Sequence, residues 1–199
     1  MRELLIATGN KGKIPGLLEG LKGAPFVFKT LNDIAIPEGL EVEEPGTTYE
    51  AHAIIKAFVY GKHANMLSLA DDSGLELDAF PEAMGVQTVH YFDGTRAERV
   101  AKLLEMMNDV PAEKRTCRYR DVIAMYDPVN DKVRFAHGVT EGVLATEPLG
   151  EGGFGFDQVF ISSDLGKAFG ESTVEEIDSV SHRGRALRKA KEILMTEFV

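Results

Sequence analysis

Strand patterns and helical patterns alternate along the whole chain, and this alternation constrains its fold more than any other feature. Residues 3–8 form a short apolar run typical of a strand, and residues 26–31 predict a second strand. Between them, residues 14–21 are typical of a helix with Pro15 in its first turn. This mixture favours an α/β fold with a mixed sheet. No internal repeat, low-complexity tract or linker appears, so residues 1–199 are expected to form a single domain.

The middle of the chain continues the mixture. A T-x-x-E capping box at Thr47 and Glu50 predicts a helix that runs to about residue 65. Four apolar residues are expected to form its buried stripe: Ile54, Ile55, Phe58 and Val59. A strand is expected over residues 67–70, ending in the turn sequence DDSG, with the alternating segment LELDAF as the next strand.

The second half of the chain is rich in strand patterns. A capping box at Thr95 and Glu98 predicts a further helix. From Arg115 onward, strands are predicted in TCRYRDVIAMY, KVRFAHGVTEGVLA and FDQVFI. A C-terminal helix is expected to begin at Ser181, which is a plausible N-cap.

Charge and cysteine content narrow the possible functions. The formal net charge of −10 makes long nucleic acid a poor partner, because phosphate neutralisation needs a basic face. A small anion can still bind where a few cations gather locally. Cys117 is the only cysteine, which predicts a reducing cytoplasm and favours a buried hydrophobe over a nucleophile. No apolar stretch has the length of a membrane span, and Asn10 and Lys11 cut short the first apolar run, which argues against a signal peptide.

The loop ATGNKGK, residues 7–13, follows the first predicted strand. It is not a P-loop, because Ala7 stands in place of the first glycine and Ile14 in place of Ser or Thr. A strand that delivers a polar loop to a helix N-terminus still presents free N–H groups to an anion. The loop's side chains add donors and positive charge: Thr8, Asn10, Lys11 and Lys13. A solvated turn is the plainer alternative.

The sequence ADDSG, residues 70–74, places two carboxylates side by side. Adjacent strand residues point to opposite faces, so only one of Asp71 and Asp72 can face a given pocket. Carboxylate oxygens are the hard ligands that Mg²⁺ prefers. The acidic loop before residue 47 offers a second carboxylate from Glu41, Glu43 or Glu44. Ordinary turn chemistry explains Asp-Asp-Ser-Gly equally well.

Two further segments combine glycine, aromatic and basic residues. GEGGFGFD, residues 150–157, contains a literal G-x-G-x-x-G, but a predicted strand follows it where a dinucleotide fingerprint needs a helix. This loop could admit a flat base beside Phe154 and Phe156, or it is simply a hairpin with core phenylalanines. SHRGRALRK, residues 181–189, gathers cations at a helix start, where they oppose the helix dipole unless a ligand compensates.

The remaining histidines show no metal-ligand spacing, and they are interpreted as structural or solvent-facing: His52, His63, His90 and His137.

In this order, ATGNKGK, ADDSGLELDAF, GEGGFGFDQVF and SHRGRAL resemble the inosine triphosphate pyrophosphatase family, which hydrolyses non-standard purine nucleoside triphosphates such as ITP, dITP and XTP. The similarity runs from Leu4 to the C-terminal helix and includes EEPGTTYEAHAIIKA. It implies a long mixed β-sheet with flanking helices that form two lobes around a central cleft, usually as a homodimer. The implied reaction is Mg²⁺-dependent hydrolysis to the monophosphate plus pyrophosphate, which cleanses the nucleotide pool.

The resemblance also implies a role for individual residues. The triphosphate would be held by Thr8, Gly9, Asn10, Lys11, Gly12, Lys13 and Lys56. Glu43 and Asp72 would hold Mg²⁺, Asp72 would also act as the base, and Ser73 would line the same pocket. The purine would be enclosed by Phe154, Gly155, Phe156 and Asp157, with its edge read by Asp157, His182 and Arg183.

Two departures from the family pattern leave the substrate open. Phe156 stands where the family has tyrosine, and Ile177 stands where it has a lysine that contacts the nucleotide. Lys167 and Arg185 are the possible substitutes for that lysine. Two alternatives therefore remain: a nucleotide-binding homologue that has lost turnover, and a pyrophosphatase of another modified nucleotide.

Overall fold

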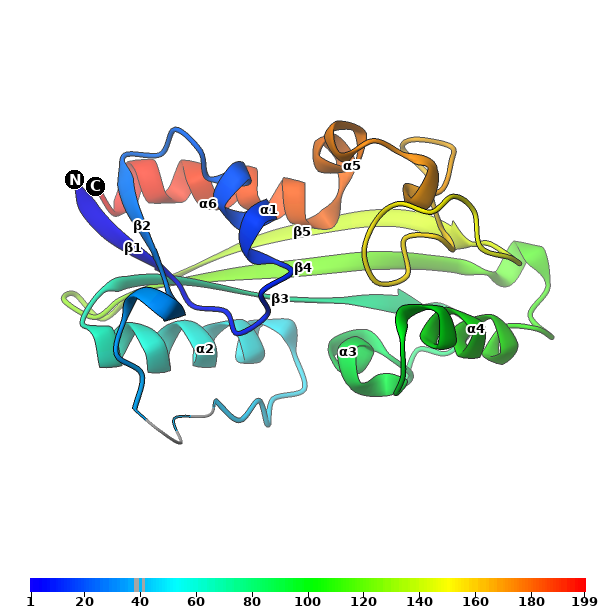
Figure 1. The fold of residues 1–199 in the computed structure, drawn as a ribbon, viewed down its shortest axis with the longest axis horizontal. Coiled ribbons are helices and arrows are strands. Elements are labelled where there is room, and N and C mark those ends of the chain that lie inside the picture. The colour runs from blue at the N-terminus through cyan, green and yellow to red at the C-terminus, as the bar shows by residue number, and fades with distance from the viewer. Residues whose placement is uncertain (38–39, 41) are drawn as a thin grey trace. The chain divides into compact units, whose positions relative to one another are not determined.

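The computed structural model describes residues 1–37, 40 and 42–199 (Figure 1). Its strands form a six-stranded sheet in the order β2-β1-β3-β4-β5-β6. The strands are β1 (Arg2–Ile6), β2 (Phe26–Thr30), β3 (Leu67–Leu77), β4 (Thr116–Asp127), β5 (Lys132–Leu144) and β6 (Phe160–Ser162). The α-helices are α1 (Ile14–Gly20), α2 (Tyr49–Ala64), α3 (Thr88–Tyr91), α4 (Arg96–Met106), α5 (Val174–Val180) and α6 (His182–Glu197). The predicted α/β class with a mixed sheet is confirmed.

The chain divides into two compact units, each assembled from separate segments. Unit 1 comprises Met1–Asp72, Asp121–His137 and Ala186–Val199. Unit 2 comprises Ser73–Arg120 and Gly138–Arg185. Each unit has its own hydrophobic core.

Parallel strands organise unit 1. Strand β1 pairs in parallel with β2 on one side and with β3 on the other, where Ile6 lies opposite Leu69. Helices α1 and α6 cover one side of these strands and α2 covers the other side (Figure 1). The core between β1, α1 and α6 contains Leu4, Ile6, Leu17, Leu187, Leu194 and Phe198. Because parallel strands end at the same edge, the loop after β1 and the carboxylates after Leu69 meet there.

Helix α2 differs from its sequence prediction in two ways. Its N-cap is Thr48, whose hydroxyl accepts from Ala51 N, so the predicted cap at Thr47 was wrong by one residue. The predicted stripe was also wrong: Phe58 is exposed, and the buried residues are Tyr49, His52, Ala53, Ala57 and Gly61. The cause is close packing, because a Cβ on Gly61 would lie 2.4 Å from Ser68 Oγ.

Strand β3 also corrects a prediction, because it runs unbroken through DDSG where a turn between two strands was expected. Gly74 lets the segment at Gly85 approach the strand; a Cβ there would lie 2.0 Å from Gly85 O. Thr88 then binds the strand backbone, with its hydroxyl accepting from Leu75 N at 2.9 Å. The glycine therefore marks a close approach within unit 2 rather than a turn.

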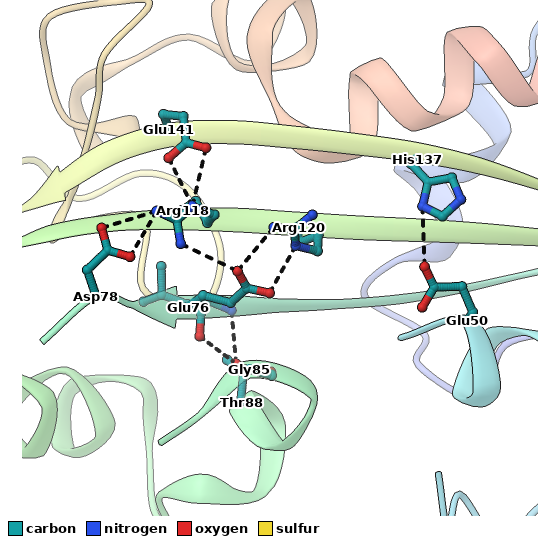
Figure 2. Close-up of polar contacts among 10 residues, drawn as sticks. Glu50, Glu76, Asp78, Gly85, Thr88, Arg118, Arg120, His137 and Glu141 are labelled. Carbon is teal, nitrogen blue, oxygen red and sulfur yellow. Dashed lines mark hydrogen bonds and ion pairs between the residues drawn. The ribbon is translucent and has the colours of Figure 1, made fainter. Parts of the chain in front are cut away.

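Cross-strand ion pairs join the strands of unit 2 (Figure 2). Arg120 Nε donates to Glu76 at 2.9 Å, and Arg118 contacts Asp78 at 2.9 Å and Glu141 at 3.1 Å. These pairs are partly exposed, and each stabilises by only about 0.2–1 kcal/mol.

Local signals in the second half were mostly accurate. The capping box of Thr95 and Glu98 is confirmed, and Ser181 accepts from Gly184 N as the expected N-cap of α6. Strand β6 is shorter than FDQVFI, because residues 155–159 form turns. No helix follows the glycine-rich loop directly, so the rejection of a dinucleotide fingerprint stands. Within the described ranges, no helix combines the length and apolar character needed to cross a membrane.

Candidate functional site

The loop after β1 is shaped by its own side chains. Thr8 is buried, and its hydroxyl accepts from Asn10 N at 3.2 Å. Asn10 Oδ1 in turn accepts from Gly12 N at 3.0 Å. Gly9, Lys11 and Gly12 are exposed, so the loop presents backbone and one lysine to solvent.

The two lysines of this loop have different surroundings. Lys13 is buried, and its ammonium lies 2.8 Å from Asp71 Oδ2 in a fully buried ion pair. Lys11 is exposed. Lys13 thus offsets a buried carboxylate, while Lys11 is accessible to an incoming anion.

A second cluster of charged side chains joins α2 to Asp72, the last residue of β3 that belongs to unit 1. Lys56 Nζ lies 3.0 Å from Glu44 Oε2 and 3.3 Å from Asp72 Oδ1. Burial alone would lower the pKa of Lys56, but the charges of Asp72 and Glu44 outweigh burial and raise that pKa above its ordinary value. Lys56 therefore carries its charge at neutral pH.

Asp72 lies at the centre of this cluster. Burial raises the pKa of Asp72 above its ordinary range, although Lys56, Lys13 and His52 act in the opposite direction. Asp71 and Asp72 have different partners, Lys13 and Lys56 respectively, as expected for neighbours on a strand. A raised pKa in a buried carboxylate is a common mark of a functional site.

The cluster has the donor set of a divalent-cation site. Among the described residues, three ligand atoms lie within 4.8 Å of one another, and they come from Glu44, His52 and Asp72. Asp72 Oδ2 is buried and accepts no hydrogen bond. Two carboxylates and an imidazole suit a divalent metal ion.

This donor set only partly matches the sequence prediction. Glu43 is exposed and lies outside the group, whereas its neighbour Glu44 belongs to it. Glu41 lies outside the described residues. His52 was interpreted as structural or solvent-facing; it is buried, and the folded chain brings its ring to the two carboxylates. Ser73 follows Asp72 on β3 and is half-buried.

In unit 2, Arg96 organises the glycine-rich loop. Its guanidinium donates to the backbone oxygens of Gly152, Gly153 and Gly155 at 2.6, 3.0 and 3.2 Å. Gly153 and Gly155 have positive φ, which favours glycine. Sequence reasoning missed Arg96; its position next to the Thr95 cap gave no hint of a contact almost sixty residues away.

Asp157 closes this loop. Its carboxylate accepts from Phe154 N at 2.6 Å. Desolvation raises the pKa of Asp157 to about 6, even though the Phe154 N–H and the charges of Arg96 and Arg183 favour its ionised form. Phe154 is 57% exposed, whereas Phe156 is buried against Phe92. The two phenylalanines therefore have different roles: Phe156 is part of the core, and Phe154 is free to contact a ligand.

The start of α6 brings a histidine to the same unit's aromatic residues. His182 is buried and stacks on Tyr119 at 4.7 Å with an interplanar angle of 14°. Arg183 is half-buried, and its charge acts on Asp157. Asp157 and Arg183 therefore lie in one electrostatic environment. Their role in reading a base edge stays a prediction from the family resemblance.

The two candidate substitutes for the replaced family lysine, Lys167 and Arg185, are both ion-paired in the folded chain. Ile177 packs against the unit 2 core. Lys167 is paired with Glu176 at 2.7 Å, and Arg185 is paired with Asp164 at 3.0 Å while donating to Val139 O. Cys117 is fully buried and burial raises its pKa to about 12, which confirms it as a small hydrophobe and not a nucleophile.

Fold and clusters together define an α/β protein with a candidate divalent-cation centre bordered by the half-buried Lys56 and the buried Lys13. The sequence model of the Ham1 family matches residues 4–193, and the chain belongs to this family.

Individual relatives match over nearly their full lengths. The dITP/XTP pyrophosphatase of Desulforamulus reducens is 42% identical, over 99% of this chain and 98% of its own. The dITP/XTP pyrophosphatase of Bacillus subtilis is 36% identical over 98% of each chain. Among solved structures, a HAM1 protein from Coxiella burnetii superposes with a TM-score of 0.88 at 34% identity, covering 98% of each chain.

Proposed function

We propose that this chain is a nucleoside triphosphate pyrophosphatase that hydrolyses dITP, XTP and ITP to the monophosphate and pyrophosphate. The observation that carries the proposal is the cluster of Lys56 on α2, Asp72 on β3 and Glu44 in the loop before α2. Its support is the 42% identity over 99% of the chain to a dITP/XTP pyrophosphatase. Residues 1–199 would act as one functional domain.

In this proposal the triphosphate is held by unit 1. The exposed backbone of Gly9 and Gly12 and the side chain of Lys11 would bind phosphate oxygens, with Thr8 and Asn10 holding the loop in shape. Lys56 would exchange its contact with Glu44 for a phosphate oxygen. Lys13 would contribute its charge while remaining paired with Asp71.

Asp72 is the proposed general base. It would accept a proton from a water whose oxygen attacks the α-phosphorus; the α–β bridging bond breaks and pyrophosphate leaves. Its raised pKa suits this role, because a base is most effective when its pKa approaches the working pH. When bound, a divalent cation, which we take to be Mg²⁺, would neutralise charge on the phosphates.

Glu43 and Glu44 are the two candidates for the second carboxylate ligand of the cation, beside Asp72. Glu44 lies in the cluster, and the assignment of Glu43 remains a prediction from the family resemblance. A matched pair of variants separates them. Glu44→Gln is expected to weaken divalent-cation activation, and the same loss in Glu43→Gln would return the role to Glu43.

The base is assigned to unit 2. Phe154 would stack on the purine, and Asp157 with His182 and Arg183 would recognise its edge. ITP and XTP carry a 6-oxo group where adenine has an amino group. A donor aimed at that oxygen would be left unpaired by ATP, which costs about 1–3 kcal/mol. Because Ile177 stands where the family has a nucleotide-contacting lysine, base preference has to be measured for this chain.

Pyrophosphate release decides between the proposal and its alternatives. The purified chain is assayed with dITP, XTP, ITP, ATP and GTP, with and without Mg²⁺. We expect Mg²⁺-dependent release from the first three, with kcat/KM at least about tenfold above that for ATP. Tight dITP binding without hydrolysis would instead favour a homologue that has lost turnover. The same products from a different base would favour a pyrophosphatase of another modified nucleotide.

Two properties remain proposals from the sequence. A homodimer is expected from the family resemblance, and sedimentation velocity on the purified chain tests it. A cytoplasmic location is expected from the single cysteine, and fractionation of cells that express the tagged chain tests it.

A further inference from the structure

We propose that Nδ1 of His52 is a third protein ligand of the divalent-cation centre, beside Asp72 and Glu44, and that it shifts the centre's preference from Mg²⁺ towards Mn²⁺. The inference rests on the proposed function for the location of the centre. It goes beyond that function because it assigns a nitrogen ligand that an all-oxygen Mg²⁺ site lacks.

A hydrogen bond to the backbone determines which ring nitrogen of His52 carries the proton. His52 Nε2 lies 2.7 Å from Gly46 O. A carbonyl oxygen can only accept, so Nε2 carries the proton, and in the neutral ring Nδ1 presents its lone pair. A backbone carbonyl that fixes the ring in this way is the usual outer partner of a metal-ligating histidine.

Nδ1 of His52 faces one oxygen of each of two carboxylates. It lies 3.3 Å from Asp72 Oδ2 and 3.4 Å from Glu44 Oε2. Asp72 Oδ2 nevertheless accepts no hydrogen bond, so the ring is not oriented as a donor towards it. His52 is 4% exposed, so its ring is held within unit 1 and does not project into solvent. Electron pairs of the buried His52 and Asp72 and of the exposed Glu44 therefore converge, and a cation among them would stabilise the arrangement.

Lys56 does not fill this position. Its ammonium contacts Asp72 through Oδ1, at 3.3 Å, whereas Nδ1 of His52 faces Oδ2. The two oxygens of one carboxylate thus have separate partners. Lys56 also contacts Glu44 Oε2 at 3.0 Å, so only that oxygen would be shared between the ammonium and the metal ion.

The chemical consequence is a change in metal preference. Mg²⁺ strongly favours oxygen ligands and keeps much of its water. Imidazole nitrogen binds first-row transition metals more readily, and affinity for mixed nitrogen and oxygen sites rises from Mn²⁺ along the series. A centre that includes His52 should therefore bind Mn²⁺ with clearly higher affinity than an all-carboxylate site does.

The test is pulsed EPR of Mn²⁺ bound to the full chain without nucleotide. We expect nitrogen modulation from a directly bound imidazole, which changes when the chain is labelled with ¹⁵N-histidine and disappears in His52→Asn. Titration followed by EPR should show that this variant loses at least about tenfold in Mn²⁺ affinity. Its Mg²⁺ affinity, measured by competition, should change by less than about threefold.

His63 provides a matched control. It lies on the same helix, and its Nε2 also contacts a backbone carbonyl, Ala35 O, at 2.7 Å, but it is exposed and outside the cluster. His63→Asn should retain both the nitrogen modulation and the Mn²⁺ affinity.

Each result of the EPR and hydrolysis measurements either supports or overturns one of the two proposals. Bound Mn²⁺ without nitrogen modulation in the unmodified chain overturns the proposal, whether or not His52→Asn folds. No Mn²⁺ binding at all overturns it too. Hydrolysis of dITP that persists in either case leaves the proposed function standing. Imidazole-bound Mn²⁺ in a chain that hydrolyses nothing supports the ligand and refutes the proposed function.

Discussion

Two carboxylates, Asp72 in unit 1 and Asp157 in unit 2, have raised pKa values for the same reason, desolvation, but their neighbours differ. Asp72 lies among the lysines Lys56 and Lys13 and the imidazole of His52, and it has one oxygen without a hydrogen bond. Asp157 accepts a backbone N–H and lies among aromatic residues and a glycine-rich loop. Burial alone thus does not assign a role. The surrounding groups suit Asp72 for metal and proton chemistry and Asp157 for recognition.

The largest expected effect is at Asp72. Asp72→Asn removes the base and one ligand, and we expect kcat for dITP to fall by about 10³-fold or more. The fold should be retained, because the substitution removes a buried charge whose ionisation the fold disfavours. Pyrophosphate release and urea unfolding measure the two properties. Asp78→Asn, an exposed carboxylate just after β3, is the control. Unchanged turnover in Asp72→Asn would remove this residue from the mechanism.

The next effect concerns the stability of unit 1. Lys13→Met leaves Asp71, which is fully buried, without its ammonium partner, and we expect the free energy of unfolding to fall by about 3 kcal/mol. Adding Asp71→Asn should restore much of that loss. Lys11→Met is the matched control, since Lys11 is exposed on the same loop. Equal stability of the two lysine variants would show that the buried pair does not stabilise the fold.

The sequence was most informative where structure is decided locally. The strand before ATGNKGK, the Pro15 helix and the capping box of Thr95 and Glu98 follow from neighbouring residues, and the structure contains them. The unbroken β3 was not predictable, because Gly74 looks like a turn residue until Gly85 is known to pack on it. Likewise α2 buries Ala53, Ala57 and Gly61 only because the strand beneath it is so close.

The candidate site, too, was predictable from local motifs but not where its contacts join distant residues. Asp72 and Lys56 could be named from motifs. The pairing of His52 with Glu44 could not, because the sequence of the loop before α2 does not fix which of several acidic residues faces the helix. Arg96 was missed for a related reason: its three acceptors are backbone oxygens, which leave no trace in side-chain patterns.

A smaller effect is expected from the pH dependence of Asp157. The pKa of Asp157 is about 6 in the folded chain against an ordinary 3.8, so between these values the folded state binds more protons and stability falls as pH rises. Asp157→Asn removes this dependence. Between pH 4 and pH 7.5 its free energy of unfolding should gain about 1–2 kcal/mol relative to the unmodified chain, a reduced figure because Asp157 keeps some exposure to water. Urea unfolding at both pH values measures it; a constant difference would contradict the raised pKa.

The smallest expected effect is that of Phe154→Ala, which should weaken nucleotide binding while leaving the stability of unit 2 almost unchanged. Phe154 is 57% exposed, so Phe154→Ala should change the free energy of unfolding by less than about 0.5 kcal/mol. Loss of a stacking face should nevertheless weaken nucleotide binding by about 1 kcal/mol, seen as a roughly fivefold rise in KM for dITP and XTP alike. Val174→Ala, at another exposed apolar residue of unit 2, should alter neither property. If Phe154→Ala leaves KM unchanged, the glycine-rich loop does not contact the base, and recognition in unit 2 would depend on Asp157 and Arg183 without an aromatic platform.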